Sequence, residues 1–529
     1  MRAIFLTTLV ILLTACSSSA VIGEEPAPPA PAAGNLASSS SARREAELPV
    51  PYQETGGDRP GSFSESSASE NSPAEGPALF PLEASVPLVA WNSEQRRYEL
   101  RLVDPMTGYV FPDRPPIDVS HSTRNAPNLA LSPDGSRLAA TTGVGSFCEA
   151  YAGYPSCQPS ADSIRLIDLQ TWREAGADLL AHIDASPSPF KGWASPLVFS
   201  QDSKRFAVAL NDRAGTSVLI YDSGTGQFIG KQALAIRPRL MEFTSDGSQL
   251  MIYGSPLAEI PGISQPEPPS ALLLDASTLE TQWKTLLPGI LDGTWCLESC
   301  ETSSESARFV YWSPAVVFDS ERGRLYIVHA DEDRLTTVNF LGRNVRNLAI
   351  GPAPNWIERL LALTATVAEA KYWPQGGIKS AVLSQDGSII YVVGRTMTLS
   401  KDSNGEWRGS ETPLGLTVIE AVNGHELATR ESDAGRIRSS TDHRYIILDW
   451  GFLGTVEVLE AETLEQVGAI EDWEVRLGQR LDGRAVILLA GWTGESQTAP
   501  TRFAMLELEP FDVITPWSVS GEAFWATAP

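Results

Sequence analysis

The chain has 529 residues, with 65 Asp and Glu against 40 Lys and Arg and a formal net charge of −25. This acidic balance argues against nucleic acid as a partner and against purely electrostatic adhesion to anionic lipid, because both need clustered basic side chains. Length alone would suggest about three or four domains, but an array of repeats can grow as a single body.

The N-terminal residues predict export. Arg2 gives a short basic start, and residues 3–13 form an apolar run that is too short to span a bilayer as a mature helix. The stretch Leu13-Thr14-Ala15-Cys16 resembles the bacterial lipobox, in which a signal peptidase cuts before the cysteine. The resemblance implies a lipoprotein signal peptide over residues 1–15 and a lipidated Cys16. The alternative is an ordinary signal peptide with a chance cysteine.

Residues 16–85 are rich in Ser, Pro, Ala, Gly and Glu and poor in aromatic side chains. Such a segment cannot bury enough apolar surface to offset its ordering entropy, so we expect a disordered tether. The folded domain, residues 86–529, would then lie outside the cytoplasm. Lipid on Cys16 alone would anchor it to the bacterial cell membrane or to an outer membrane.

Two turn signatures alternate along residues 86–529. The first joins two apolar strands through a tight turn, as in Ser132-Pro133-Asp134-Gly135, and variants of it return near residues 200, 244, 384, 440 and 480, with a longer one from Asp319 to Gly323. The second is an apolar strand that ends in an acidic or amide residue before a Thr/Gly-rich turn. The side-chain oxygen of that acidic or amide residue is expected to accept hydrogen bonds from backbone N–H groups of the turn. The residues at this position are Asp104, Asp168, Asp222, Asp275, Asn339, Glu420, Glu460 and Glu509.

The count of turns predicts the topology. If each unit has four strands, a to d, the first signature is the a–b turn and the second the c–d turn. One a–b turn is missing at the N-terminal end, while a strand-like segment, residues 522–527, is left over at the other end. A ring closed by that last strand accounts for both facts and removes exposed sheet edges. We therefore expect an all-β fold, one propeller of eight four-stranded blades, with seven blades as the fallback. The blades would begin near residues 86, 127, 194, 238, 309, 378, 436 and 475.

A family resemblance supports this fold. Residues 324–339 (RLYIVHADEDRLTTVN) and 388–394 (SIIYVVG) resemble the YVTN type of bacterial propeller repeat. The Ser-Pro-Asp-Gly turns are similar to the WD-like repeats of TolB-type periplasmic propellers. The resemblance covers about residues 86–529 and implies the fold without implying a function, since propellers host many activities.

The extra sequence is confined to the b–c and d–a connections, which lie on one face of a propeller. These insertions are residues 144–162, 185–195, 255–270, 286–308, 351–377, 396–414 and 494–501. Elaborated loops on a rigid scaffold are where binding usually resides. Within residues 355–370 the apolar spacing and the capping box from Asn355 to Glu358 predict one short helix.

Tryptophans gather toward the same face. Aromatic platforms suit sugars, peptides and protein partners, although packing between blades is the alternative for those at strand ends. Trp91, Trp450 and Trp492 fall at the ends of b strands, and Trp193, Trp295, Trp356 and Trp373 fall in d–a connections.

Four cysteines remain besides Cys16. An even number in an exported protein favours disulfides, and the short spacings favour Cys148–Cys157 and Cys296–Cys300. A metal site is the alternative, but no histidine lies close to either pair in the sequence and neither pair has the spacing of a zinc knuckle.

No catalytic constellation stands out. The five histidines are scattered, and Asp134, Asp202, Asp246 and Asp386 occupy turns. We therefore predict no catalytic residues, metal or cofactor, and a monomeric, non-enzymatic scaffold that binds a protein, peptide or glycan. The alternative is a propeller enzyme, lactonase-like or quinoprotein-like dehydrogenase, with its site at the central channel.

Overall fold

A computed structural model describes residues 85–119, 127–142, 146–151, 154–159, 163–176, 178–181, 193–212, 215–256, 268–298, 308–352, 376–401, 407–450, 454–481, 484–492, 501–519 and 523–525. All of them belong to the unit Pro77–Pro529. The predicted signal peptide, the lipidated Cys16 and the tether up to residue 84 lie outside this set, and so does the predicted helix.

The first blade is completed by the end of the chain, as the turn count predicts. Its strands are β1 (Val86–Asn92), β2 (Arg97–Val103) and β3 (Ile117–Asp118), with β36 (Ala523–Trp525) beside β1. Val89 lies opposite Phe524 in this antiparallel pairing. The last described strand in the sequence, β36, therefore supplies the innermost strand of the first blade.

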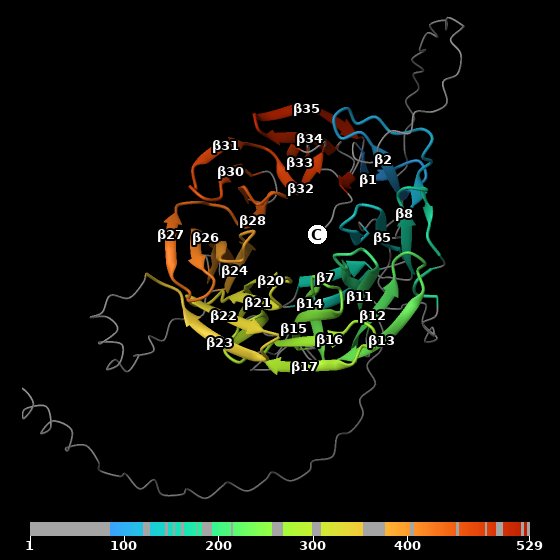
Figure 1. Cartoon of the computed structure of the whole chain (residues 1–529). Helices are drawn as coiled ribbons and strands as arrows, with labels where there is room; N and C mark the ends of the chain where they lie inside the picture. The colour runs from blue at the N-terminus through green and yellow to red at the C-terminus, as the bar shows by residue number, and fades with distance from the viewer. Residues whose placement is uncertain are drawn as a thin grey trace, which may run out of the picture. The chain divides into compact units, whose positions relative to one another are not determined.

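Seven further blades follow in chain order, each antiparallel and each with its first strand innermost, as Figure 1 shows for β32 to β35. Blades 2 to 4 are β4 (Leu129–Leu131), β5 (Arg137–Thr142), β8 (Ser163–Asp168) and β9 (Arg173–Glu174); β10 (Trp193–Phe199), β11 (Arg205–Asp212), β12 (Gly215–Asp222) and β13 (Phe228–Leu234); and β14 (Ile236–Phe243), β15 (Gln249–Pro256), β16 (Ser270–Asp275) and β17 (Thr281–Leu286).

Blades 5 to 8 are β20 (Ala315–Asp319), β21 (Arg324–Val328), β22 (Arg334–Asn339) and β23 (Asn344–Ala349); β24 (Gly376–Leu383), β25 (Ile389–Lys401), β26 (Trp407–Glu420) and β27 (Glu426–Arg430); β28 (Arg436–Ser439), β29 (Tyr445–Asp449), β30 (Val456–Glu460) and β31 (Gln466–Ile470); and β32 (Glu474–Leu481), β33 (Arg484–Trp492), β34 (Thr501–Leu508) and β35 (Phe511–Val519). The protein is an eight-bladed β-propeller, and the seven-blade fallback is wrong.

Two hairpins are added to this plan. One is β6 (Ser146–Tyr151) with β7 (Tyr154–Pro159), between the b and c strands of blade 2. The other is β18 (Gly293–Glu298) with β19 (Arg308–Ser313), between blades 4 and 5. The predicted start of blade 5 near residue 309 is therefore early: β19 pairs in parallel with β24 of blade 6, and the inner strand of blade 5 begins at Ala315.

Five of the described a–b turns share one hydrogen-bond network, which explains their recurring sequence. In the first, the Ser132 hydroxyl donates to Asp134 Oδ1 (2.6 Å) and accepts the Arg137 N–H (2.8 Å). The same two bonds recur from Ser200, Thr244, Ser384 and Ser440. Gly135 adopts a φ of 69°, a conformation that glycine reaches without a Cβ clash.

The c–d turns follow the prediction where the side chain is short. Asp104, Asp168, Asp222, Asp275 and Asn339 each accept a backbone N–H of the turn. Among the longer side chains, Glu420 and Glu460 bond instead to the side chains of Asn423 and Thr463. For Glu509 the prediction is wrong, because its carboxylate reaches Arg444 (2.6 Å) and the hydroxyl of Tyr445 in blade 7.

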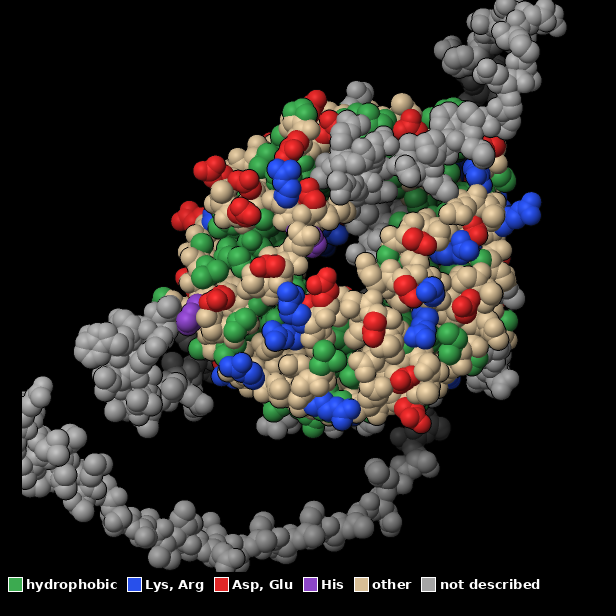
Figure 2. Space-filling model, viewed as in Figure 1, with side chains coloured by type: hydrophobic (Ala, Val, Ile, Leu, Met, Phe, Trp, Pro, Cys, Tyr) green, Lys and Arg blue, Asp and Glu red, His purple; other side chains and the backbone are tan. Residues whose placement is uncertain are grey.

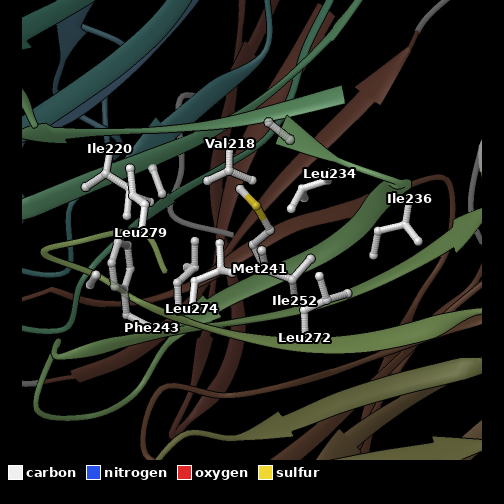
Figure 3. Close-up of a cluster of buried hydrophobic side chains, with 14 residues drawn as sticks. Val218, Ile220, Leu234, Ile236, Met241, Phe243, Ile252, Leu272, Leu274 and Leu279 are labelled. Carbon is white, nitrogen blue, oxygen red and sulfur yellow. The ribbon is translucent and has the colours of Figure 1, made fainter. Parts of the chain in front are cut away.

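The hydrophobic core lies between blades. Figure 3 shows the cluster between blades 3 and 4, in which Val218 and Ile220 of β12 face Met241 and Phe243 of β14. Among the described residues, one such cluster joins each neighbouring pair around the ring. The pair formed by blades 8 and 1 is included, where Leu88 packs with Phe503. Burial of apolar surface therefore continues through the point of closure.

Candidate functional site

Strand direction decides which loops share a face. Because consecutive strands of a blade are antiparallel, the ends of its b and d strands lie on one side of the ring and the a–b and c–d turns lie on the other. We call the first side the insertion face. By chain connection it receives both added hairpins and the long extension of β25 and β26 beyond Gly394.

Trp450 stands on the insertion face directly after β29. Its side chain is 47% exposed, and the guanidinium carbon of Arg395 lies 4.4 Å from the centre of its ring. Arg395 is fixed by an ion pair with Glu411 (2.8 Å) and by a hydrogen bond to the Asp433 carbonyl (2.9 Å). A cation held over an aromatic face strengthens the contact and leaves the indole in one orientation. The ring is thus both exposed and rigidly presented.

Trp91 is placed differently. It lies next to the last residue of β1, near the strand end as predicted, but it packs edge-on against Tyr98 at 5.0 Å between ring centres and lies against the core between blades 1 and 2. This contact matches the packing alternative for the strand-end tryptophans.

The other predicted tryptophans are placed by backbone only or lie outside the described residues. Trp492 ends β33, whereas Trp193 begins the inner strand β10 and Trp295 lies in β18, so neither of the latter two sits in an irregular connection. Trp356 and Trp373 fall outside the set.

The b–c loop of blade 5 carries a second polar group that the sequence reasoning missed. It runs from His329 to Asp333 and is closed by a hydrogen bond from the His329 N–H to the Arg334 carbonyl (3.0 Å). His329 is 1% exposed. Its Nδ1 lies 3.2 Å from Glu332 Oε1 and 4.0 Å from Asp331 Oδ1. The signal in the sequence is the run His329-Ala330-Asp331-Glu332, in which the carboxylates lie next to the histidine although no second histidine does.

Burial and neighbouring charges shift the pKa values of the side chains in and around this loop. Burial, with Arg334 and Lys379 nearby, lowers the pKa of His329 to about 4. Burial also raises the pKa of the carboxyls of Asp331 and Glu332 and lowers that of the Lys379 ammonium. The imidazole is therefore neutral at physiological pH.

The added hairpin β18–β19 holds this loop from the side. Trp312 of β19, which is 4% exposed, packs against Ala330 of the loop. Gly377 of β24 lies beside both, and a Cβ there would come within 2.8 Å of the Ala330 carbonyl oxygen. Glycine permits that close approach of two backbones. The loop is consequently clamped between blade 6 and the hairpin.

An ion pair with a buried carboxylate ties the start of blade 4 to the connection that follows it. Asp292, which is 7% exposed, pairs with Arg239 of β14 and accepts the hydroxyl hydrogen bond of Tyr253 (2.7 Å). Arg239 also donates to Ser313 Oγ at the end of β19 (2.9 Å). These contacts position the hairpin rather than form an open pocket.

The first cysteine pair is compatible with its predicted bond at the level of the backbone. Cys148 and Cys157 are directly opposite each other in the β6–β7 hairpin. Antiparallel partners have Cα atoms about 4.5–5.5 Å apart, within the range that a disulfide spans. For the second pair, Cys300 lies outside the described residues. Both disulfides stay predictions.

Acidic and basic side chains border the opening at the centre of the ring in Figure 2. Inner-strand residues that contribute charge include Arg436, which pairs with Glu474 of blade 8 at 3.1 Å. In the part of the chain described, no helix is both long and apolar enough to cross a membrane.

Comparison with known proteins identifies no family for this chain. No protein-family model and no curated protein matches the chain. Similar solved structures include a eukaryotic initiation factor (11% identity, 84% of this chain and 99% of that chain covered, TM-score 0.44) and the dihydro-heme d1 dehydrogenase NirN (12%, 84% and 76%, 0.46). Another is the Pseudomonas aeruginosa periplasmic gluconolactonase PpgL (11%, 73% and 95%, 0.37). Similarity at this level carries no argument about activity.

Proposed function

We propose that this chain is a non-enzymatic scaffold that captures a protein or peptide through its insertion face, with Trp450 as the central contact. An exposed tryptophan stacked on a fixed arginine is the composition of a protein-binding hot spot. Leu414, 45% exposed on the same extension of β26 as Glu411, adds apolar surface. Aromatic stacking with a glycan is the other form of this proposal.

We also propose that the protein is anchored to a membrane outside the cytoplasm. The lipobox-like Leu13-Thr14-Ala15-Cys16 supports a lipid anchor on Cys16, and the tether after it would hold a YVTN/TolB-like propeller clear of the membrane. The whole protein would thus be an extracytoplasmic, membrane-anchored monomer that presents one binding face.

Site-specific photo-crosslinking in the producing cells tests the face. A photoreactive residue replaces Trp450 in one variant and Val422 in the other. Val422 is the matched control because it is 57% exposed but lies in the c–d turn of blade 6, on the opposite side. We expect one defined adduct from position 450 and none from position 422. Equal adducts from both positions, or adducts from 422 alone, would contradict the proposal. Lactone hydrolysis or dehydrogenase turnover by the purified chain would favour the enzymatic alternative.

A further inference from the structure

Three side chains of the blade 5 loop bring atoms with lone pairs close together. Nδ1 of His329 and the carboxylate oxygens of Asp331 and Glu332 all lie within 4.8 Å of one another. His329 Nδ1 is buried and has no hydrogen-bond partner among the described residues. Oxygen and nitrogen lone pairs this close repel one another unless a positive charge lies between them.

The hydrogen bonds behind the imidazole decide which of its nitrogens carries the proton. The Thr336 hydroxyl donates its only hydrogen to Asn347 Oδ1 (2.7 Å). Toward His329 Nε2, also 2.7 Å away, the hydroxyl therefore accepts. Nε2 carries the hydrogen, and Nδ1 presents its lone pair to the two carboxylates. Histidines that bind metals usually donate their other ring N–H in this way.

We propose that His329 Nδ1, Asp331 and Glu332 form a binding site for a divalent transition-metal ion, with Zn²⁺ as the expected occupant. One imidazole and two carboxylates suit zinc better than the all-oxygen sites of Mg²⁺ or Ca²⁺. Ligands around a tetrahedral zinc ion lie roughly 3.4 Å apart, and His329 Nδ1 lies 3.2 Å from Glu332 Oε1 and 4.0 Å from Asp331 Oδ1. Water would complete the coordination.

The side chains of Arg334 and Lys379 lie beside the proposed metal site and leave room for an ion. Arg334 Nε lies 3.0 Å from Glu332 Oε1, the same oxygen that lies 3.2 Å from His329 Nδ1, and a carboxylate has lone pairs for both this N–H and a metal ion. The Lys379 ammonium donates to the Glu332 carbonyl (3.4 Å) and lies 3.9 Å from Asp333. Packing of Trp312 and Gly377 around Ala330 fixes the loop, so little ordering is needed on binding. The site does not depend on the proposed function.

Calorimetric titration of the chelator-treated full chain with Zn²⁺ tests the site. The variants are Asp331→Asn and Glu332→Gln, which keep side-chain shape, and the matched control is Asp333→Asn. Asp333 belongs to the same loop, but its side chain is 87% exposed and lies outside the cluster. We expect one strong equivalent in the wild type and in the control, weakened at least tenfold in the other two.

Co²⁺ as a spectroscopic probe separates this site from the cysteines. Binding at the loop predicts d–d absorption without a thiolate charge-transfer band, and the signal should disappear in Asp331→Asn and Glu332→Gln. Circular dichroism melts verify that the variants are folded. Absence of strong Zn²⁺ binding, equal affinity in all four proteins, or a thiolate band for the strong equivalent would overturn the proposal.

Discussion

At the scale of single residues, the Glu242 carboxyl has a pKa that its surroundings raise. It lies near the end of β14, half-buried beside Asp319 and Ser320 of blade 5. Burial raises its pKa to about 7, and the Asp319 charge adds to this, while a hydrogen bond with Ser320 opposes it. Folding therefore takes up a proton at this site between pH 4.5 and about 7.

Glu242→Gln is expected to stabilise the fold at alkaline pH. The raised folded-state pKa means that the wild-type stability is complete below about pH 4.5 and falls as pH rises through 7. A shift of that size corresponds to at most about 3 kcal/mol, and solvent near the half-buried carboxyl reduces this to roughly 1–2 kcal/mol. Chemical unfolding at pH 5 and pH 8 measures the effect. A gain at pH 5 that equals the gain at pH 8 would contradict it.

Local chemistry explains which residues were predictable. Asp134 and its counterparts are turn residues because their partners lie within a few positions along the chain. Arg395 and Trp450 are 55 positions apart and meet only because blades 6 and 7 are neighbours. The lone-pair arrangement at His329 depends on the pairing of Thr336 with Asn347 across β22 and β23, which spacing alone does not fix.

At the scale of elements, the a–b turn is the unit that repeats most faithfully. In blade 6 the Ser384 hydroxyl donates to Asp386 Oδ1 (2.7 Å) and accepts the Ile389 N–H (3.0 Å). Hydrogen bonds from Ser384 and Ser388 lower the pKa of Asp386 to about 2. The charged carboxylate is therefore part of the folded turn.

Ser384→Ala should destabilise the protein by about 1–2 kcal/mol at pH 7, because it removes both bonds of the hydroxyl. Gln385→Ala is the control, an exposed side chain of the same turn for which a change below about 0.5 kcal/mol is expected. The Asp386 contribution exists above its unfolded pKa near 3.8 and is lost as pH falls toward 2, so the deficit should shrink there. Unfolding curves at pH 7 and pH 2.5 check both points; an undiminished deficit in acid would contradict the account.

The added elements were harder to predict than the repeats. The sequence pattern locates the insertions between b and c or d and a strands, but it does not predict that β18 and β19 pair and join the sheet of blade 6. That pairing of β19 with β24 spans only Trp312↔Gly377 and Ser313↔Ile378. It depends on the close packing of Gly377 against Ala330, a contact between distant segments.

At the scale of the whole molecule, ring closure leaves the two sides of the propeller unequal. The side opposite the insertion face carries tight a–b and c–d turns closed by backbone hydrogen bonds, such as Gly135 N–H to the Ser132 carbonyl. The insertion face carries the long hairpins, the Trp450 ring and the His329 loop. A closed ring of interblade cores makes a rigid support, which is why elaborate loops can be added on one side without loss of the fold.

Affinity for the partner recovered by crosslinking at position 450 tests the central claim most directly. Titration of the full chain against that partner compares the wild type with Trp450→Ala and with Val422→Ala. We predict that Trp450→Ala weakens binding roughly 30-fold or more, which is about 2 kcal/mol, while Val422→Ala changes it less than about twofold. Unchanged affinity for Trp450→Ala, with both variants folded, would contradict capture through the insertion face.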